Sequence, residues 1–396
     1  MEFHCGSLGR PAHEGVRPTV KTLSPPPSTV CSPLWLAPKE RLQELIDTLR
    51  TQRYAVVAPV IDQAAIVYDE IDHIDRLPRG WIDFQAAGHY QLQRTDSDRW
   101  FDFVVGPHSW KKYLFPSRCV LSTGTPSPEG WQFESTSDDA PAYAFLGVRA
   151  CELAAIQVQD RVFLNGPWVD PIYQHRRSRA FIIAVNCTRS GENCFCVSMQ
   201  TGPRCHTGYD LALTETADGF IVDIGSERGQ ELVATLELPA AAQEERTLAD
   251  LLQQRAAAQQ SKRMDTEDLP QLLMENLEHP RWKDVGDRCL SCTNCTMVCP
   301  TCFCCSVDDV TDLNTGEVER QRQWDSCFHE AFSNLNGRPV RNDIRSRYRQ
   351  WLTHKLATWH DQFGTSGCVG CGRCITWCPV GIDITTEVAA LREGST

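Results

Sequence analysis

The sequence CLSCTNCTMVCP spans residues 289–300, and its cysteine pattern returns as CVGCGRCITWCP at residues 368–379. Each stretch spaces four cysteines as Cys-x2-Cys-x2-Cys-x3-Cys and ends in proline. Three thiolates on a tight loop can hold three corners of one iron–sulfur cubane, while the fourth, at the start of the next turn, points elsewhere. The two stretches therefore predict two 4Fe-4S clusters.

The fourth cysteine of each motif is expected to ligate the cluster of the other motif, as in two-cluster ferredoxins. One predicted ligand set is Cys289, Cys292, Cys295 and Cys378, and the other is Cys368, Cys371, Cys374 and Cys299. Two structural zinc sites are the alternative, but zinc motifs usually consist of two separated Cys-x2-Cys pairs without this triplet and proline. Gly370 and Gly372 would let backbone amides approach the sulfurs, which tunes the reduction potential.

A third group of cysteines lies in the N-terminal half of the chain: Cys151, Cys187, Cys194, Cys196 and Cys205. Cys194 and Cys196 are two residues apart, so an extended chain would direct both thiols to one side. Cys187 follows a strand-like run that ends at Val185, where a loop can reach a cofactor. Four of these thiolates could hold a third 4Fe-4S cluster, and buried free thiols are the alternative.

Four further cysteines near the two motifs have no clear ligand spacing: Cys302, Cys304, Cys305 and Cys327. They could pack, shield the clusters or serve as spare ligands, and structural roles are the preferred interpretation. Cys5, Cys31 and Cys119 have no partners at ligand spacing and are interpreted as incidental.

Composition and charge narrow the possible partners. The formal net charge of -12 provides no basic field for nucleic acid, and the longest apolar runs, such as residues 180–185, are far shorter than the roughly 20 residues of a membrane-spanning helix. No export signal is recognisable at the N-terminus. Twenty cysteines in such a chain indicate metal binding rather than disulfides, so we expect a cytoplasmic protein that binds no nucleic acid and does not insert into membranes.

The organisation along the chain predicts an α+β protein. Residues 1–38 hold Pro25, Pro26 and Pro27 without periodic apolar residues, which favours a disordered extension. Residues 39–239 predict a mixed α/β domain and residues 240–284, rich in Ala, Gln, Glu and Leu, a helical connector. Residues 285–396 predict a mainly helical two-cluster ferredoxin domain.

Local patterns predict individual elements of the α/β domain. Apolar residues at helical spacing indicate a helix over residues 39–53. Short runs rich in β-branched and aromatic residues predict strands. These runs cover residues 54–60, 66–68, 101–105, 142–148, 180–185 and 220–224.

The gap of almost 70 residues between Cys299 and Cys368 is helical in composition. This arrangement resembles the α-helical ferredoxin domain of succinate dehydrogenase iron–sulfur subunits and heterodisulfide reductase subunits.

Further motifs, in order along the chain, are GVRACE at 147–152, CFC at 194–196, TGP at 201–203, CPTCFC at 299–304, WDSCF at 324–328, and HK at 354–355 ahead of GCVGCG at 367–372. Together they resemble the β subunit of cytoplasmic nickel–iron sulfhydrogenases and the related iron–sulfur subunit of anaerobic sulfite reductase. The resemblance extends from about Leu42 to the C-terminus. Departures are the extension before Pro38, Glu152 where aspartate is expected, and Cys205.

The resemblance implies an electron-transfer subunit that works with a flavin- and NAD(P)-binding subunit and with the large and small subunits of a nickel–iron hydrogenase. It also implies that Cys151, Cys187, Cys194 and Cys196 are the ligands of the third cluster, with Cys205 as a substitute. No catalytic residue is predicted in this chain, because paired nickel-binding Cys-x2-Cys motifs, phosphate-binding glycine loops and His-Glu-x-x-His are absent from the sequence.

Two rival hypotheses remain at this point. The chain could be the equivalent subunit of an anaerobic sulfite or sulfur reductase. It could also be a self-contained reductase whose α/β domain binds a small substrate beside the third cluster.

Overall fold

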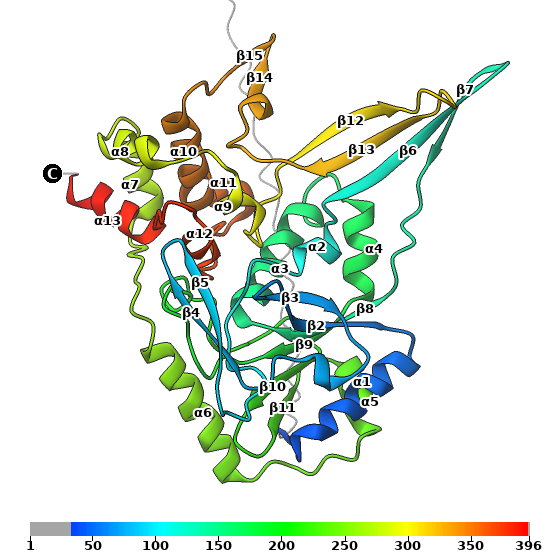
Figure 1. The fold of residues 1–396 in the computed structure, drawn as a ribbon, viewed down its shortest axis with the longest axis vertical. Helices are drawn as coiled ribbons and strands as arrows, with labels where there is room; N and C mark the ends of the chain where they lie inside the picture. Colours follow the sequence, from blue (N-terminus) through cyan, green and yellow to red (C-terminus); the bar gives the residue numbers. More distant parts are fainter. Residues whose placement is uncertain (1–32, 395–396) are drawn as a thin grey trace, which may run out of the picture. The chain divides into compact units, whose positions relative to one another are not determined.

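The computed structural model describes residues 33–394, and its N-terminal half is built on a seven-stranded mixed sheet (Figure 1). The sheet order is β1-β11-β10-β9-β8-β2-β3. The strands are β1 Leu34–Leu36, β2 Ala55–Asp62, β3 Ala65–Glu70, β8 Tyr143–Val148, β9 Phe181–Val185, β10 Leu211–Glu215 and β11 Phe220–Ile224. The four central strands, β10, β9, β8 and β2, are parallel, and the outer strands pair antiparallel.

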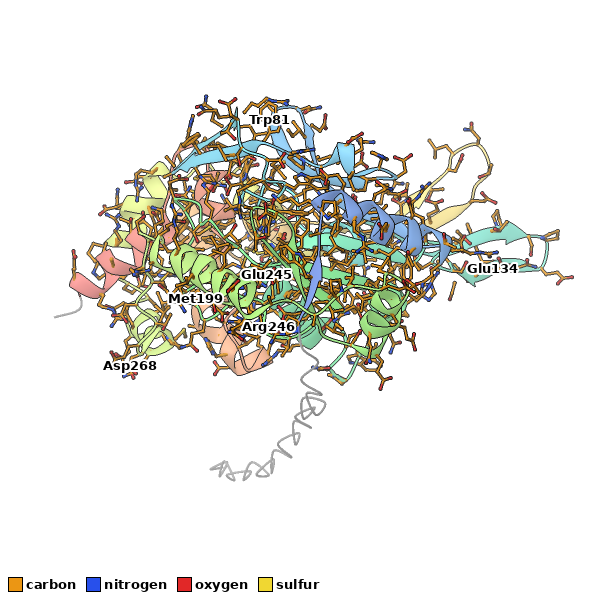
Figure 2. All side chains as sticks on the ribbon, turned by 90° about the horizontal axis from the view of Figure 1, so that it is seen from below. Trp81, Glu134, Met199, Glu245, Arg246 and Asp268 are labelled. Atoms are coloured by element: carbon orange, nitrogen blue, oxygen red, sulfur yellow. The ribbon has the colours of Figure 1, made fainter. Side chains whose placement is uncertain are left out.

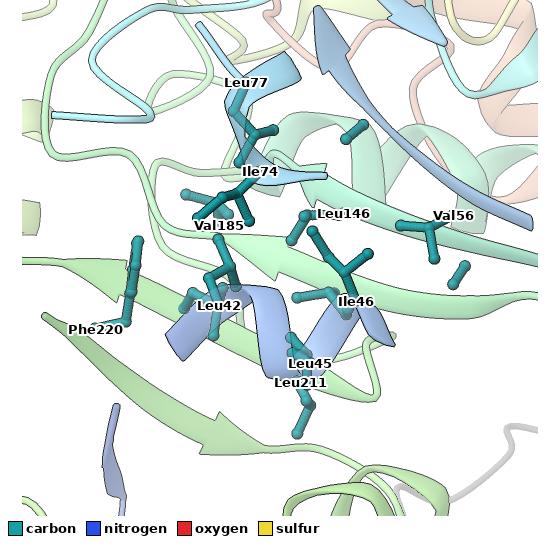
Figure 3. Close-up of a cluster of buried hydrophobic side chains, with 14 of the residues drawn as sticks. Leu42, Leu45, Ile46, Val56, Ile74, Leu77, Leu146, Val185, Leu211 and Phe220 are labelled. Carbon is teal, nitrogen blue, oxygen red and sulfur yellow. The ribbon is translucent and has the colours of Figure 1, made fainter. Parts of the chain in front are cut away.

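Helices cover both faces of this sheet. One face packs against α1 (Leu42–Thr51), whose Leu42, Leu45 and Ile46 contact the strands, and against α5 (Glu227–Ala234) (Figure 3). The other face packs against α2 (Lys111–Leu114), α3 (Ala150–Phe163) and α4 (Pro171–Arg179). The central strands are buried on both faces, which explains their continuous apolar runs.

The prediction of a strand at residues 101–105 is wrong. These residues are buried but irregular, because charged side chains rather than a neighbouring strand bind their backbone. Arg149 donates to the carbonyls of Phe101 and Phe103 at 2.8 and 2.7 Å, and Glu215 accepts from the backbone N–H of Phe101 at 2.9 Å. Buried backbone groups need partners, and here side chains supply them.

The prediction of a disordered extension over residues 1–38 is wrong for residues 34–36, which form a strand. Strand β1 pairs with β11 at the sheet edge, and Leu36 is fully buried. The rest of that prediction, on residues 1–32, lies outside the described residues.

The C-terminal half is mainly helical and confirms the α+β class. Its helices are α6 Gln243–Ala258, α7 Leu269–Glu275, α8 Arg281–Arg288, α9 Asn294–Met297, α10 Ile344–Thr353, α11 Trp359–Phe363, α12 Arg373–Thr376 and α13 Ile384–Glu393, with a π-helical turn at His354–Thr358 between α10 and α11. The apolar faces of α7, α8, α10, α12 and α13 meet in one core around Trp282, Tyr348, Trp351 and Leu391. Helix α6 instead packs through Ala249 against Ile221 of β11, and α11 packs through Trp359 beside Val369. None of the helices within residues 33–394 is long and apolar enough to cross a bilayer.

A four-stranded antiparallel sheet joins the two halves of the chain, and the sequence patterns did not predict it. Its order is β12-β13-β6-β7, with β6 Arg118–Ser127 and β7 Gly130–Ser135 from the first half and β12 Cys305–Thr311 and β13 Val318–Trp324 from the second. All of β7 is exposed, and Figure 2 shows Glu134 of this strand far from Met199. Two hairpins, β4–β5 (Trp81–Ala86, His89–Arg94) and β14–β15 (Asn334–Leu335, Arg338–Pro339), complete the strands. The domain boundaries at residues 239 and 284 remain predictions.

Replacing Glu215 with alanine should strongly destabilise the fold. Glu215 forms a buried ion pair with Lys39 at 3.0 Å and binds the backbone of residues 100–101, so its loss leaves a buried cation without its counter-ion and with only the Asp98 carbonyl at 3.3 Å. We expect the free energy of unfolding to fall by about 3–5 kcal/mol in denaturant titration. Glu44→Ala, which breaks the exposed pair with Arg41, is the control and should cost less than about 1 kcal/mol. Equal effects of the two substitutions would contradict the role given to Glu215.

Candidate metal centres

The four cysteines of the first predicted set line one cavity. Cys289 follows α8, Cys292 precedes α9, Cys295 lies within α9, and Cys378 follows α12. Phe328, Tyr348 and Trp351 form an apolar wall. The N–H groups of Ser291 and Ile382 donate to the sulfurs of Cys289 and Cys378 at 3.4 and 3.3 Å. The exchange of the fourth cysteine between motifs is thus geometrically possible.

The four cysteines of the second set, Cys299, Cys368, Cys371 and Cys374, line a second cavity. The Gly370 N–H donates to the Cys368 sulfur at 3.5 Å. Gly370 has a φ of 63° and Gly372 a φ of 77°, and an added Cβ would lie 2.7 Å from the Cys196 backbone or 2.4 Å from the Asn193 carbonyl oxygen. Only glycine fits these two positions, because both the conformation and the close approach exclude a side chain.

A buried lysine contacts the second cavity. Lys355 Nζ lies 3.3 Å from the Cys299 sulfur and donates to Thr301 Oγ1 and the Gly367 carbonyl, both at 3.1 Å. Burial alone would lower the pKa of Lys355, but the charges of Cys299 and Cys302 raise it well above its usual value. Lys355 therefore places a permanent positive charge beside the cavity.

Four cysteines of the N-terminal group line a third cavity: Cys151, Cys187, Cys194 and Cys196. Arg149, at the end of β8, and Gln260 also line it, and Gln260 Nε2 donates to the Cys196 sulfur at 3.1 Å. Cys151 starts α3 just after β8, and Cys187 follows β9, so the cavity lies at the carboxyl ends of two adjacent parallel strands. This is the edge at which open α/β sheets bind ligands.

The three cavities are alike in size and follow one another. Their volumes are about 30, 20 and 20 Å³, so the third is as large as the second. Cys374 lines both the first and the second cavity, and Cys371 lines both the second and the third. The cavities therefore form a row with shared cysteine walls.

Cys299 differs from the other lining cysteines, because the neighbouring Cys302 thiol and Lys355 lower its pKa. Burial makes most of the other thiols poor acids without a metal. It raises the pKa of Cys289, Cys295, Cys371 and Cys374, and it raises the pKa of Cys368 to about 12 and of Cys196 to about 12. Iron stabilises the thiolate, so binding of a cluster would release these protons. The sulfur donors and the dry, apolar walls fit an iron–sulfur cluster.

A buried ion pair connects the second cavity to the third. Arg373, between Cys371 and Cys374, contacts Glu152 at 2.5 Å, and neither side chain is more than 1% exposed. Glu152 also accepts hydrogen bonds from Tyr68 at 2.8 Å and Trp110 at 3.0 Å. Glu152, which stands where the family resemblance leads us to expect aspartate, thus provides the negative charge that pairs with Arg373.

The other cysteines of residues 33–394 do not line the three cavities. Cys205 is buried in the core that contains β9, and Cys302, Cys304, Cys305 and Cys327 lie near the ends of β12 and β13 that face the ferredoxin loops. Within residues 33–394, no three His, Cys, Asp or Glu side chains converge on the position of a single metal ion.

A family model described as a 4Fe-4S dicluster domain matches residues 288–382. Sulfhydrogenase 2 subunit beta of Pyrococcus furiosus is 34% identical over 259 residues, which are 64% of this chain and 75% of the relative. The chain belongs to the sulfhydrogenase beta-subunit family. No solved structure matches it.

Membership in this family and the dicluster match confirm an iron–sulfur electron-transfer subunit with two 4Fe-4S clusters. The match spans both cysteine motifs, so the zinc alternative for these eight cysteines is wrong. No role was predicted for Lys355, Arg373, Arg149 or Glu152. All four lie inside motifs quoted above, but only the fold shows which charges meet.

Replacing Lys355 with methionine should lower the reduction potential of the centre in the second cavity. The positive charge favours the reduced, more negative state, and a unit charge in contact with a ligand sulfur at an effective dielectric constant of about 20 shifts the potential on the order of 100 mV. An EPR-monitored redox titration measures this shift. Lys112→Met is the control, because Lys112 Nζ bonds the Tyr68 carbonyl instead. An unchanged or higher reduction potential in Lys355→Met would refute the role given to the positive charge of Lys355 beside the second cavity.

Proposed function

We propose that this chain relays single electrons along a row of three 4Fe-4S clusters in a cytoplasmic hydrogenase complex. The observation that carries the proposal is the row of three cysteine-lined cavities in which Cys374 and Cys371 form the shared walls. When bound, such clusters accept and donate one electron at a time.

The proposed ligands of the two dicluster centres follow the cavities. Cys289, Cys292, Cys295 and Cys378 would hold the first cluster, and Cys299, Cys368, Cys371 and Cys374 the second. Each motif then gives its fourth cysteine to the other centre, which fixes the two loops to each other.

The third cluster is proposed for Cys151, Cys187, Cys194 and Cys196. The cavity that these four thiols share, its volume and its direct contact with the loop of the second centre support the proposal. Gln260 would orient one of the sulfurs, because its Nε2 donates to Cys196, and Arg149 would place a positive charge in the lining of the same cavity. The alternative of buried free thiols does not explain why four of them face one space.

The two ends of the row differ in exposure. Cys292 and Leu290 are exposed at the first cavity, with Leu290 61% exposed, whereas Cys151, Cys194 and Cys196 at the third cavity are buried. An electron could therefore enter or leave through the surface around Leu290. We propose that this surface faces a partner's redox centre.

The partners that we propose are a flavin- and NAD(P)-binding subunit and the large and small subunits of a nickel–iron hydrogenase. The name of the Pyrococcus relative, a sulfhydrogenase subunit, supports a complex of this kind. Hydrogen would be split in the partner and not in this chain. An iron–sulfur subunit of a sulfite or sulfur reductase is the competing assembly.

Replacing Cys194 with serine should remove one cluster and leave two. Since each cluster holds four irons, we expect about 12 iron atoms per wild-type chain and about 8 in Cys194→Ser. Iron and acid-labile sulfide analysis of anaerobically purified protein, together with EPR spin counting, gives the number.

Cys205→Ser is the matched control for this experiment, because Cys205 is equally buried but does not line the third cavity. It should keep the wild-type iron content. A loss of iron in Cys205→Ser, or none in Cys194→Ser, would contradict the proposed ligand set.

Anaerobic affinity purification of this chain from its native cell should co-purify a nickel–iron pair and a flavin subunit, and the complex should reduce NAD(P) with hydrogen. Mass spectrometry identifies the subunits and absorbance at 340 nm follows the reaction. A sirohaem subunit in their place would move the assignment to sulfite reduction, and a lone chain that turns over substrate would favour the self-contained reductase.

A further inference from the structure

The apolar wall of the first cavity carries two polar atoms. Tyr348 and Trp351 line this cavity, and both belong to α10, where a spacing of three residues places them on one face of the helix. The Tyr348 hydroxyl and the Trp351 Nε1–H are buried, and neither has a hydrogen-bond partner among residues 33–394. The two side chains are only 2% and 3% exposed, so bulk water does not reach them. Burial of a donor without an acceptor is unfavourable, which indicates that an acceptor belongs at this place.

The other two buried tyrosines of the described chain have their acceptors. Tyr68 donates to Glu152 and Tyr173 donates to Asp160, both at 2.8 Å. Tyr348 has no such carboxylate and lines a cysteine cavity instead. Its hydroxyl therefore differs from the others in its surroundings and not in its burial.

The buried indoles show the same relation less strictly. Trp282 belongs to the same core as Trp351 and donates to the Asn276 carbonyl at 2.7 Å. Trp351 lacks a partner and lines the first cavity, whereas other indoles without a partner line none of the three cavities. These indoles are Trp100, Trp359 and Trp377. Trp351 is thus a second donor at the cavity, and Tyr348 is the more distinctive one.

Packing fixes the direction of both rings. Tyr348 and Trp351 meet edge to face with their centroids 5.5 Å apart. Phe328, which lines the same cavity, contacts them at 6.1 and 5.7 Å between centroids. A donor on a ring that is held in this way can serve an acceptor without reorganisation.

The linings of the three cavities differ in charge. Lys355 and Arg373 line the second cavity, and Arg149 and Arg189 line the third. Within residues 33–394, no charged side chain lines the first cavity. The sulfur atoms at this centre therefore depend on neutral donors, of which the backbone supplies the two N–H groups already described.

We propose that the Tyr348 hydroxyl and the Trp351 N–H donate hydrogen bonds to sulfur atoms of the first iron–sulfur centre and raise its reduction potential. One-electron reduction adds negative charge to a cluster and its thiolates, so a donor stabilises the reduced state more than the oxidised state. At the first centre, two neutral donors thus take the place of the cations at the second. The inference rests on the proposed ligand set of the first centre.

Tyr348→Phe tests the proposal, because it removes the hydroxyl and keeps the ring. The cluster-loaded full chain and its variants are titrated anaerobically under EPR, and Cys292→Ala identifies the signal of the first centre by its loss. At a fixed potential, the ratio of reduced to oxidised first centre should fall roughly three- to tenfold in Tyr348→Phe, which is the effect of one hydrogen bond. At 59 mV per tenfold for one electron, the midpoint falls by about 30–60 mV. Trp351→Phe should shift the same midpoint in the same direction.

Tyr173→Phe and Trp282→Phe are the matched controls. They remove a buried hydroxyl and a buried indole, but neither residue lines one of the three cavities. Both should lower the free energy of unfolding and leave every midpoint potential unchanged. The signal that shifts in Lys355→Met should also stay in place in Tyr348→Phe, because it belongs to the second centre.

A spectroscopic measurement separates a hydrogen bond from a change in packing. Protein whose clusters are reconstituted in D₂O should show deuterium couplings at the reduced first centre in pulsed EPR. Tyr348→Phe should lose one of these couplings while it keeps the wild-type iron content.

The contrary outcomes separate this inference from the ligand set. An unchanged potential of the first centre in Tyr348→Phe, or an undiminished set of deuterium couplings, would overturn the inference and leave the ligand set standing. Loss of iron in Tyr348→Phe would also overturn it, because the hydroxyl would then serve assembly of the centre and not its potential. A full set of cluster signals in Cys292→Ala would overturn the ligand set, and the inference with it.

Discussion

The arrangement of the centres depends on the buried ion pair between Arg373 and Glu152. Charges withdrawn from water are costly unless their partners and hydrogen bonds are complete. Glu152 meets this condition through Tyr68, Trp110 and the Arg149 N–H. Arg373 meets it in part, because Nε and Nη2 donate to the carbonyls of Gly106 and His108 while its buried Nη1 has no hydrogen-bond partner. Since Arg373 belongs to a ferredoxin loop and Glu152 to the helix that begins beside Cys151, the pair sets the position of one cysteine cavity against another.

Further hydrogen bonds join the loops that form the second and third cavities. The Phe195 N–H donates to the Gly370 carbonyl at 2.9 Å, Thr201 donates to the Val369 carbonyl at 2.7 Å, and Asn193 donates to Thr376 at 2.8 Å. These bonds hold the 193–201 loop directly against the 368–376 loop. Cysteines almost 180 residues apart in sequence thereby share one cavity wall.

The sequence predicted the features that local patterns encode. The two cysteine motifs specified the dicluster domain, and apolar runs located the strands β2, β8, β9 and β11. It did not predict β12 and β13, whose polar sequences form strands only because β13 pairs with β6 and β12 pairs with β13. Nor did it predict the irregular backbone at residues 101–105, whose partners Arg149 and Glu215 are distant in sequence. The cysteines were identified as candidates from spacing and resemblance, but the charges around them follow from tertiary contacts alone. Spacing could not reveal that Lys355 or Arg373 faces a thiol.

The sheet that joins β6 to β13 has a consequence for how the protein can be divided. Strand β13 pairs along its length with β6, which comes from the other half of the chain. A fragment that starts near residue 285 would carry both cysteine motifs but would leave an edge of β13 without its neighbour, and unpaired edges invite association with other chains. It would also lack Glu152 opposite Arg373. The ferredoxin motifs of this protein are therefore not a module that can be separated from the N-terminal half. A chain without that half would need a replacement for both strand β6 and the carboxylate of Glu152.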